Sequence, residues 1–321
     1  MSKKPKIGIT MGDPNGIGPE VVVKALGCAE IQELCEPVVF GSAEILEEAQ
    51  KLVGLRADCE LIEAGDFGKN SLMPGTADEA AGRASLSYIE KAVDTALKKE
   101  IDALVTAPIC KESIHMAGSK HPGHTEMLGE LTGTGDAIMM FEGSRFRVVL
   151  VTIHTALSNV HGLITKEKVF NTIRAANDSL INLFKIAEPR IAVCGLNPHA
   201  GESGAFGDEE IVSIAPAVLE AREIGIDVTG PMPADTLFYY ANQGTWDAVV
   251  AMYHDQGLVP FKMVSFEDGV NLTIGLPIIR TSPDHGTAFD IAWDGTADPS
   301  SMVSAIKLAL RLAGNKSTDF N

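Results

Sequence analysis

Residues 147–153 read RVVLVTI, a nearly continuous run of β-branched and other apolar residues. Two further runs have the same form, RIAVC at Arg190–Cys194 and AVVAMY at Ala248–Tyr253. Runs without polar alternation are typical of parallel strands that helices cover on both faces. Amphipathic helices are predicted between them, over Thr165–Phe184 and Asp208–Ile224. These segments together predict an α/β fold with a largely parallel sheet.

Each of the three runs is followed within a few residues by a histidine, His154, His199 or His254. Because the carboxyl ends of parallel strands share one edge of a sheet, where ligands of open α/β sheets bind, these imidazoles could converge. Three neutral imidazoles leave open positions on a divalent cation, as a catalytic metal site requires. Zn, Co, Ni and Mn suit such ligands, and Mg suits them less. A single histidine after a strand is more often a hydrogen-bonded loop residue, so both interpretations stay open from the residues alone.

The rest of the chain alternates in the same way between strand-like and helical segments. Strands are predicted at Lys6–Thr10, Pro37–Phe40 and Ala103–Thr106, and helices at about Ser42–Leu52, Ala77–Lys99 and Pro299–Ala313. After the first strand comes a glycine-rich segment, MGDPNGIGPE, at Met11–Glu20. Its spacing is not the G-x-G-x-x-G of a dinucleotide fingerprint. Its backbone N–H groups could hold an anion, or its glycines could serve a tight turn; the sequence leaves both open.

Composition limits the class of protein. The 321 residues favour two domains, and 45% hydrophobic with 21% charged residues is ordinary for a globular chain. No apolar run reaches the roughly 18 residues of a membrane span, and the N-terminal segment lacks the features of a secretory signal, so we expect a cytoplasmic protein without membrane contact. The net charge of −17 makes nucleic-acid binding an unfavourable hypothesis. The five scattered cysteines suit reduced, structural thiols.

Two polar segments admit both a structural and a functional interpretation. The segment HPGHTE at His121–Glu126 could bind a ligand, but a helix that starts at Glu126 with Thr125 as its cap is the more common explanation. Asp235 follows the turn GPMPA, where it could cap a helix or act beside a metal.

Several longer motifs, spread almost from end to end, carry a resemblance to a known family. They are MGDPNGIGPE, VTAPICK, PGHTEML, LNPHAGE, MYHDQGL and GVNLTIGLPIIRTSPDHGTAFDIA. Together they resemble the 4-hydroxythreonine-4-phosphate dehydrogenase family, whose NAD-dependent enzymes act in pyridoxal phosphate biosynthesis. The wider resemblance is to the isocitrate and isopropylmalate dehydrogenases, which do not use the Rossmann glycine fingerprint.

The resemblance implies a two-domain isocitrate/isopropylmalate dehydrogenase-like α/β fold with the active site in the interdomain cleft. It implies a discontinuous NAD-associated domain over residues 1–130 plus 275–321, and a metal, substrate and dimerisation domain over residues 131–274. A homodimer with the active site at the subunit interface is expected, because the family's metal ligands come from both subunits.

The resemblance also assigns roles to individual residues. His154, His199 and His254 would hold one divalent cation per active site (Zn, Co, Ni, Mn or Mg). The substrate contacts would be His124, Thr125, Lys262, Asn271 and Arg280, with Lys111 and Asp235 nearby; Lys262 and Asp235 are the candidates for catalysis. NAD, with NADP as an alternative, would lie against His285, Gly286, Thr287, Ala288 and Asp290. Lys and Arg are suited to a phosphorylated hydroxy acid because they make charge-assisted hydrogen bonds.

The implied reaction is NAD-dependent oxidation of the C3 hydroxyl of 4-phosphohydroxy-L-threonine, then decarboxylation to 3-amino-2-oxopropyl phosphate. The chain departs from the family pattern at Trp293, where a glycine commonly follows the alanine. A related branch, acting on 4-phosphothreonate or erythronate 4-phosphate in sugar-acid catabolism, also tends to carry the F-D-I-A-W ending, so that activity is the alternative. From another class, a phosphate acyltransferase shares a similar fold, but it leaves the three histidines unexplained.

Overall fold

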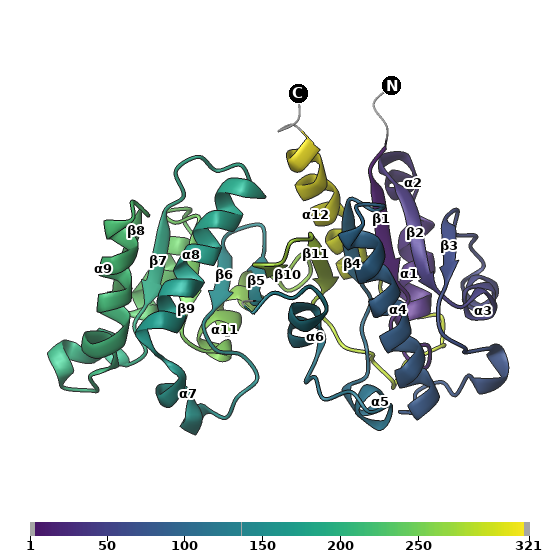
Figure 1. The fold of residues 1–321 in the computed structure, drawn as a ribbon, viewed down its shortest axis with the longest axis horizontal. Coiled ribbons are helices and arrows are strands. Elements are labelled where there is room, and N and C mark those ends of the chain that lie inside the picture. Colours follow the sequence, from purple (N-terminus) through teal and green to yellow (C-terminus); the bar gives the residue numbers. More distant parts are fainter. Residues whose placement is uncertain (1–3, 136, 318–321) are drawn as a thin grey trace. The chain divides into compact units, whose positions relative to one another are not determined.

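The computed structural model describes residues 4–135 and 137–317. The chain forms two compact units, the first made of Met1–Ala137 and Leu276–Asn321 and the second of Ile138–Gly275 (Figure 1). The first unit is therefore discontinuous in sequence. The expected association of NAD with one unit, and of metal and dimerisation with the other, stays a prediction.

A parallel sheet lies at the centre of the first unit. Its strands are β1 (Lys6–Thr10), β2 (Glu36–Gly41), β3 (Glu60–Glu63), β4 (Ala103–Thr106) and β11 (Arg280–Pro283), in the order β3-β2-β1-β4-β11. Every neighbouring pair is parallel. The three strands predicted here from apolar runs are confirmed. Because β1, β4 and β11 are adjacent, the loops that follow them emerge at the same edge of the sheet.

Helices cover both faces of this sheet. They are α1 (Gly18–Leu26), α2 (Ala29–Leu34), α3 (Ala43–Val53), α4 (Glu79–Leu97), α5 (Lys111–Met116), α6 (His124–Leu131) and α12 (Ser300–Ser317), with a 3-10 turn at Lys69–Ser71. Right-handed crossovers place α1 and α3 on one face and α4 on the other. Side chains fix where two of them begin, since Ser42 accepts from Ile45 N and Asp78 accepts from Ala81 N at 3.0 Å.

The second unit has a mixed sheet. Its strands are β5 (Ile138–Glu142), β6 (Arg147–Leu150), β7 (Ile191–Cys194), β8 (Val228–Met232), β9 (Ala248–Ala251) and β10 (Val270–Ile274), in the order β10-β5-β6-β9-β7-β8. The four strands β6, β9, β7 and β8 are parallel, and β5 is antiparallel to both of its neighbours. The three runs that predicted the fold are therefore adjacent parallel strands, and the predicted α/β class is confirmed.

The helices of the second unit are α7 (Leu157–Leu163), α8 (Lys166–Asn182), α9 (Ala215–Glu223), α10 (Ala234–Ala241) and α11 (His254–Ser265). A 3-10 segment occupies Pro198–Gly204 and a π-helical turn occupies Glu210–Ile214. The single helix expected over Asp208–Ile224 is thus divided into the π-helical turn and α9. Helices α8 and α9 pack against each other, and right-handed crossovers place α10 and α11 on the opposite face of the sheet.

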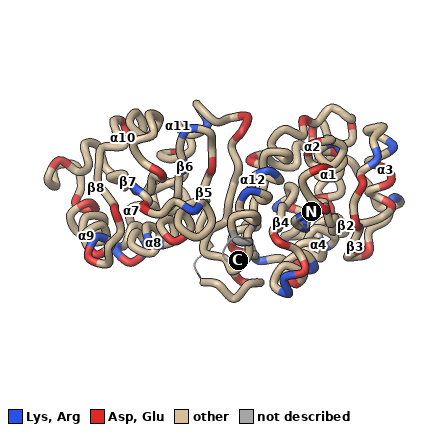
Figure 2. Tube along the Cα trace, turned by 90° about the horizontal axis from the view of Figure 1, so that it is seen from above, with Lys and Arg blue, Asp and Glu red and all other residues tan. Residues whose placement is uncertain are grey.

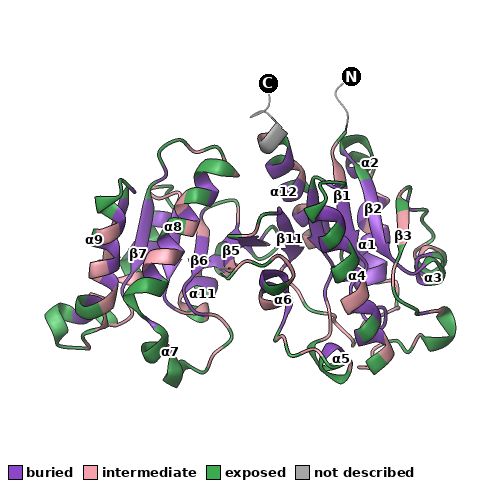
Figure 3. Cartoon of the chain, viewed as in Figure 1, coloured by how far each residue is buried: buried purple, intermediate pink, exposed green. Residues whose placement is uncertain are grey.

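Burial follows the strands in each unit, while the outer sides of helices such as α3 and α9 are exposed (Figure 3). In the second unit, Val148, Val249 and Ala192 of adjacent strands share a core with Phe261 of α11. Helices α3 and α9 each carry both acidic and basic residues (Figure 2). Within the part of the chain that the structure describes, no helix has the length and apolar character of a membrane span.

Candidate active site

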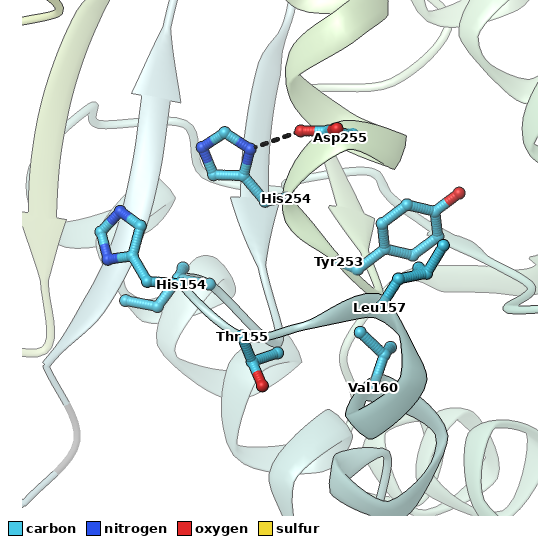
Figure 4. Close-up of a pocket in the computed structure, with 8 residues that line it drawn as sticks. His154, Thr155, Leu157, Val160, Tyr253, His254 and Asp255 are labelled. Carbon is cyan, nitrogen blue, oxygen red and sulfur yellow. Dashed lines mark hydrogen bonds and ion pairs between the residues drawn. The ribbon is translucent and has the colours of Figure 1, made fainter.

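Two of the three predicted metal ligands lie together at the carboxyl ends of β6 and β9. Backbone pairing continues beyond these strands, because Val151 N donates to Ala251 O at 2.9 Å and Thr152 N donates to Met252 O at 3.2 Å. The side chains of His154 and His254 therefore lie side by side, with 6.0 Å between their ring centroids (Figure 4).

These two histidines line a pocket of about 390 Å³ with Ile153, Thr155, Leu157, Val160, Tyr253 and Asp255. His254 is the first residue of α11, and its Nδ1 lies 2.8 Å from Asp255 Oδ1. A carboxylate on one ring nitrogen fixes the orientation of the imidazole and leaves the other nitrogen for a ligand. Apolar side chains form much of the remaining wall, but His154 is exposed and the side chain of His254 is 40% exposed, so solvent reaches both rings.

His199 does not line this pocket. It lies in the segment after β7, where the backbone turns left-handed from His199 (φ 53°) to Ser203 (φ 57°). Its ring packs near Phe206, with 6.2 Å between centroids. In residues 4–135 and 137–317, no group of three or more His, Cys, Asp or Glu side chains is arranged to hold a metal ion. The ligand role of the three histidines therefore stays a prediction.

Asn197 and Glu210 hold the His199 segment in place. Asn197 N donates to Glu210 Oε1 at 2.7 Å, and Asn197 Nδ2 donates to Glu210 Oε2 at 3.0 Å. Glu210 is buried. Gln256 ties the same region to β9, because its Oε1 accepts from Met252 N and its Nε2 donates to Gly195 O, both at 2.7 Å. The sequence analysis does not single out these polar residues; their burial among loops far apart in sequence carries no local signal.

A second polar group lies in the first unit, around Arg280. This side chain is 2% exposed, and its Nε and Nη2 donate to Thr106 Oγ1 at 3.1 and 2.5 Å. Burial lowers the pKa of Arg280 to about 9, so the guanidinium stays charged at neutral pH. Burial, and secondarily the charge of Arg280, lower the pKa of His124 well below its usual value of 6.5. A cation and a neutral imidazole therefore lie close together at pH 7.

The segment around His124 differs from its sequence prediction. Helix α6 begins at His124, with Gly123 as its N-cap, so Thr125 lies inside the first turn and caps nothing. The prediction of Thr125 as a cap is wrong because the helix starts two residues earlier than expected. Thr125 is buried, and Nε2 of His124 is buried without a hydrogen-bond partner among the described residues. Oε2 of Glu126, the residue at which that helix was expected to start, is also buried without a hydrogen-bond partner among the described residues.

The remaining predicted substrate and catalytic residues lie on separate elements. Lys111 begins α5 in the first unit. In the second unit, Asn271 lies on β10 opposite Phe141 of β5, and Lys262 lies half-buried on α11. Asp235 is exposed in the first turn of α10, where its Oδ1 accepts from Thr236 N at 2.9 Å; the N-cap is Pro233, so the capping interpretation of Asp235 is wrong.

The loop after β11 carries the predicted cofactor residues. His285 Nδ1 donates to Gly286 O at 3.0 Å, which leaves Nε2 as the other hydrogen-bonding atom of the ring, and that atom is buried without a partner in the described part of the chain. Gly286 has open space where a side chain would lie. Thr287 and Ala288 are half-buried, and Asp290 is exposed. A buried ring nitrogen beside an open stretch of backbone fits a dinucleotide, which offers hydrogen-bonding groups along its length.

The glycine-rich loop Met11–Glu20 packs against this cofactor loop. Its N–H groups already have acceptors within the chain: Asp13 N donates to Pro108 O, Asn15 N to Asp13 Oδ1, Gly16 N to Asp13 O and Ile17 N to Thr287 O. At Gly12, φ is +75° and an added Cβ would lie 2.4 Å from Pro108 O. Of the two interpretations, the structure favours the tight turn over the anion site.

Comparisons with known proteins agree with this fold and these motifs. Residues 33–309 match the family model described as "Pyridoxal phosphate biosynthetic protein PdxA". A 4-hydroxythreonine-4-phosphate dehydrogenase of Desulforapulum autotrophicum is 49% identical over 95% of this chain and 95% of that protein. A D-threonate 4-phosphate dehydrogenase of Cupriavidus necator is 47% identical over 96% of this chain and 97% of that protein.

Solved structures give the same result. The crystal structure of a 4-hydroxythreonine-4-phosphate dehydrogenase from Klebsiella pneumoniae has a TM-score of 0.86 and 40% identity, and covers 97% of this chain and 100% of that chain. An isocitrate dehydrogenase from Methylococcus capsulatus, at 15% identity and a TM-score of 0.50 over 98% of this chain and 87% of that chain, shares the fold alone.

These findings define an oxidoreductase of the isocitrate dehydrogenase-like fold. The chain belongs to the PdxA family of dehydrogenases. Membership in this family excludes the phosphate acyltransferase hypothesis as the main activity.

Proposed function

We propose that the chain oxidises the C3 hydroxyl of 4-phosphohydroxy-L-threonine with NAD and a divalent cation, in pyridoxal phosphate biosynthesis. A hydride leaves C3 for the nicotinamide and a proton leaves the hydroxyl oxygen. The β-keto acid then loses carbon dioxide to give 3-amino-2-oxopropyl phosphate. The observation that carries the proposal is the buried Arg280 guanidinium beside the neutral His124, in a chain of the PdxA family.

Arg280 is suited to bind the phosphate. It is charged, and Thr106 holds it in one orientation through two hydrogen bonds, so little side-chain entropy is lost when an anion binds. The unpartnered Nε2 of His124 supplies a neutral hydrogen-bonding group beside this charge. Thr125, Lys262 and Asn271 complete the proposed substrate contacts, and Lys262 and Asp235 are the candidates for proton transfer.

The three histidines are suitable ligands for a divalent cation, because imidazoles commonly bind such ions. His154 and His254 would hold it together, and a bound cation would act as a Lewis acid on the substrate hydroxyl. Since His199 lies outside their pocket, we propose that a second copy of the chain supplies the third ligand. Asp255 already orients the imidazole of His254 before a metal binds, and this favours metal binding.

An exposed apolar stripe on α11 supports this homodimer. Val259, Met263 and Phe266, spaced as one helical face, are 58%, 80% and 78% exposed. The stripe belongs to the helix that begins with His254. A second copy that covered it would bury apolar surface close to the pocket that lacks a third ligand.

NAD would bind the loop from His285 to Asp290. The open backbone at Gly286 allows close approach of the cofactor, and Nε2 of His285 offers a hydrogen-bonding atom. The adjoining tight turn at Gly12–Gly18 is joined to this loop by a hydrogen bond of 3.0 Å, which Ile17 N donates to Thr287 O. NADP is the alternative cofactor.

A second candidate substrate is D-threonate 4-phosphate. The observation that favours it is the near-equal identity to relatives of the two names, 49% and 47%. The two substrates share the phosphate and the hydroxyl to be oxidised but differ at C2, which carries an amino group in one and a hydroxyl in the other. The residues proposed for phosphate binding serve both equally.

A competition experiment tests the proposal. Protein stripped of metal is reconstituted separately with Zn, Co, Ni, Mn and Mg, and NADH formation is followed with the two substrates at equal concentration. We expect metal-dependent turnover and a higher kcat/KM for 4-phosphohydroxythreonine. A higher kcat/KM for D-threonate 4-phosphate would establish the second candidate, and absence of NADH with either compound under every metal would refute both.

A further inference from the structure

Trp293 ends the predicted cofactor loop in an unusual backbone conformation. Its φ is +65°, in the left-handed region that glycine adopts freely and that a bulky side chain adopts at a steric cost. Two turns lead to it, because Ile291 N donates to Ala288 O at 3.1 Å and Asp294 N donates to Ile291 O at 3.2 Å. Retaining a tryptophan here requires a compensating interaction.

The indole supplies that interaction by reaching the glycine-rich loop. Trp293 Nε1 donates to Pro14 O at 2.9 Å, and the side chain is partly buried. Pro14 lies in the tight turn between β1 and α1, far from Trp293 in sequence. The hydrogen bond therefore joins the end of the cofactor loop to the glycine-rich turn of the first unit.

A second attachment holds the other end of the cofactor loop. Ile17 N donates to Thr287 O at 3.0 Å, and a Cβ at Gly16 would lie 2.9 Å from Thr287 Cβ, so the two loops pack closely there. Between the attachments, Phe289 O lies 2.6 Å from the position of a Cβ on Gly75. Residues 288–292 are thus held at both ends and packed in the middle.

We propose that Trp293 is a positioning residue that pre-organises this loop for NAD. The inference rests on the proposed function, because it takes the loop from His285 to Asp290 as the cofactor site. Without the indole attachment, the segment from Ala288 to Trp293 keeps one fixed end and gains conformational freedom that NAD binding must then remove. The substrate and metal residues lie on other elements and are unaffected.

The test compares two substitutions at Trp293 with one at the other tryptophan. Trp293→Phe keeps an aromatic ring but removes the N–H donor, and Trp293→Gly removes the side chain while suiting the backbone. Trp246→Phe is the matched control, because Trp246 packs against the core of the second unit, whereas the proposed cofactor loop belongs to the first unit. For each protein we would measure the NADH dissociation constant by calorimetry without substrate, and amide hydrogen exchange over residues 286–293 without NADH.

We expect Trp293→Phe to weaken NADH binding about two- to tenfold, the range for one net hydrogen bond, and Trp293→Gly to weaken it at least as much. Hydrogen exchange in the loop should be faster in both variants, KM for NAD should rise, and kcat and the substrate KM should stay near wild type. Trp246→Phe should match wild type in all five quantities.

Unchanged NADH affinity in both Trp293 variants would overturn the proposal. So would weaker affinity with unchanged loop exchange, because the indole would then act by touching the cofactor. If the wild-type protein itself neither binds NADH nor forms it, the proposed function fails instead, and the loop exchange still reports whether Trp293 orders the segment.

Discussion

The imidazole of His124, whose Nε2 is buried and whose pKa is lowered by burial and by the charge of the buried Arg280, makes stability depend on pH. Its pKa in the folded protein lies well below 6.5, the ordinary value expected in the unfolded chain. The unfolded state therefore binds the proton first on acidification. The contribution of His124 to stability is complete above about pH 6.5 and is lost progressively as the pH falls below that value.

We therefore predict that His124→Gln reduces the loss of stability between pH 7 and pH 5. Below pH 6.5, His124 lowers the free energy of unfolding of the wild-type protein by at most about 1.4 kcal/mol for each pH unit. The measurement is the free energy of unfolding from urea titrations at several pH values. His161→Gln, at an exposed histidine, is the control and should leave the wild-type slope unchanged. Equal slopes in wild type and His124→Gln would show that the site does not hold a neutral imidazole.

Residue types were more predictable from sequence than residue environments. The motif PGHTEML draws attention to His124, and the family resemblance draws attention to Arg280. That Arg280 is buried, and that its charge acts on His124, depends on how segments far apart in the sequence fold together. No local pattern reports such an arrangement.

At the scale of elements, the segment from Asn197 to Glu210 positions His199 through one carboxylate. Both oxygens of Glu210 accept from Asn197, one from its backbone N–H and one from its side-chain amide. A glutamine at this position offers one oxygen and one NH₂ group, so either orientation sets a donor against a donor. The left-handed backbone from His199 to Ser203 has a conformational cost that this anchor offsets.

We predict that Glu210→Gln destabilises the chain by about 1–3 kcal/mol, the cost of a buried donor left without an acceptor. The same change should weaken metal retention, because the proposed ligand His199 loses its fixed position. Thermal unfolding and metal content after dialysis are the measurements, and Glu223→Gln on the exposed side of α9 is the control. A variant with wild-type stability and metal content would show that the carboxylate is not the anchor.

Regular elements were predicted well, since each strand of the three apolar runs carries its own burial pattern. Strands β1 and β4 have the predicted bounds. The predicted helix starts are wrong where a buried polar residue changes the local backbone. The helix expected from Asp208 starts as a π-helical turn at Glu210, whose side chain faces Asn197, and α6 starts before its expected cap.

At the scale of the whole molecule, sequence patterns alone predict the α/β class, whereas the isocitrate dehydrogenase-like fold came from motif resemblance. The positions of all three predicted metal ligands could not be predicted from sequence patterns in the same way. Adjacent parallel strands bring His154 and His254 together, as the pattern suggests, but the loop after β7 turns away and leaves His199 outside their pocket. A periodicity argument assumes that loops continue in the direction of their strands, and this loop does not.

Sharing of the metal between two chains has a distinctive consequence for mixed dimers. If His199 completes the site of the partner, a dimer of one His154→Ala chain and one His199→Ala chain has one site with both lesions and one intact site. Each variant alone should be nearly inactive, because every site then lacks a ligand. Random pairing of co-expressed variants makes about half of the dimers mixed, so activity should return to about a quarter of wild type.

The control for this experiment co-expresses His154→Ala with His254→Ala, two ligands proposed to come from the same chain. Every mixed dimer then carries one lesion in each site, so activity should remain at the level of the single variants. Recovery in the first pair and none in the second would support a site built across two chains. Absence of recovery in both, with mixed dimers verified by differently tagged chains, would mean that His199 serves its own subunit and that the loop after β7 must move to bring it there.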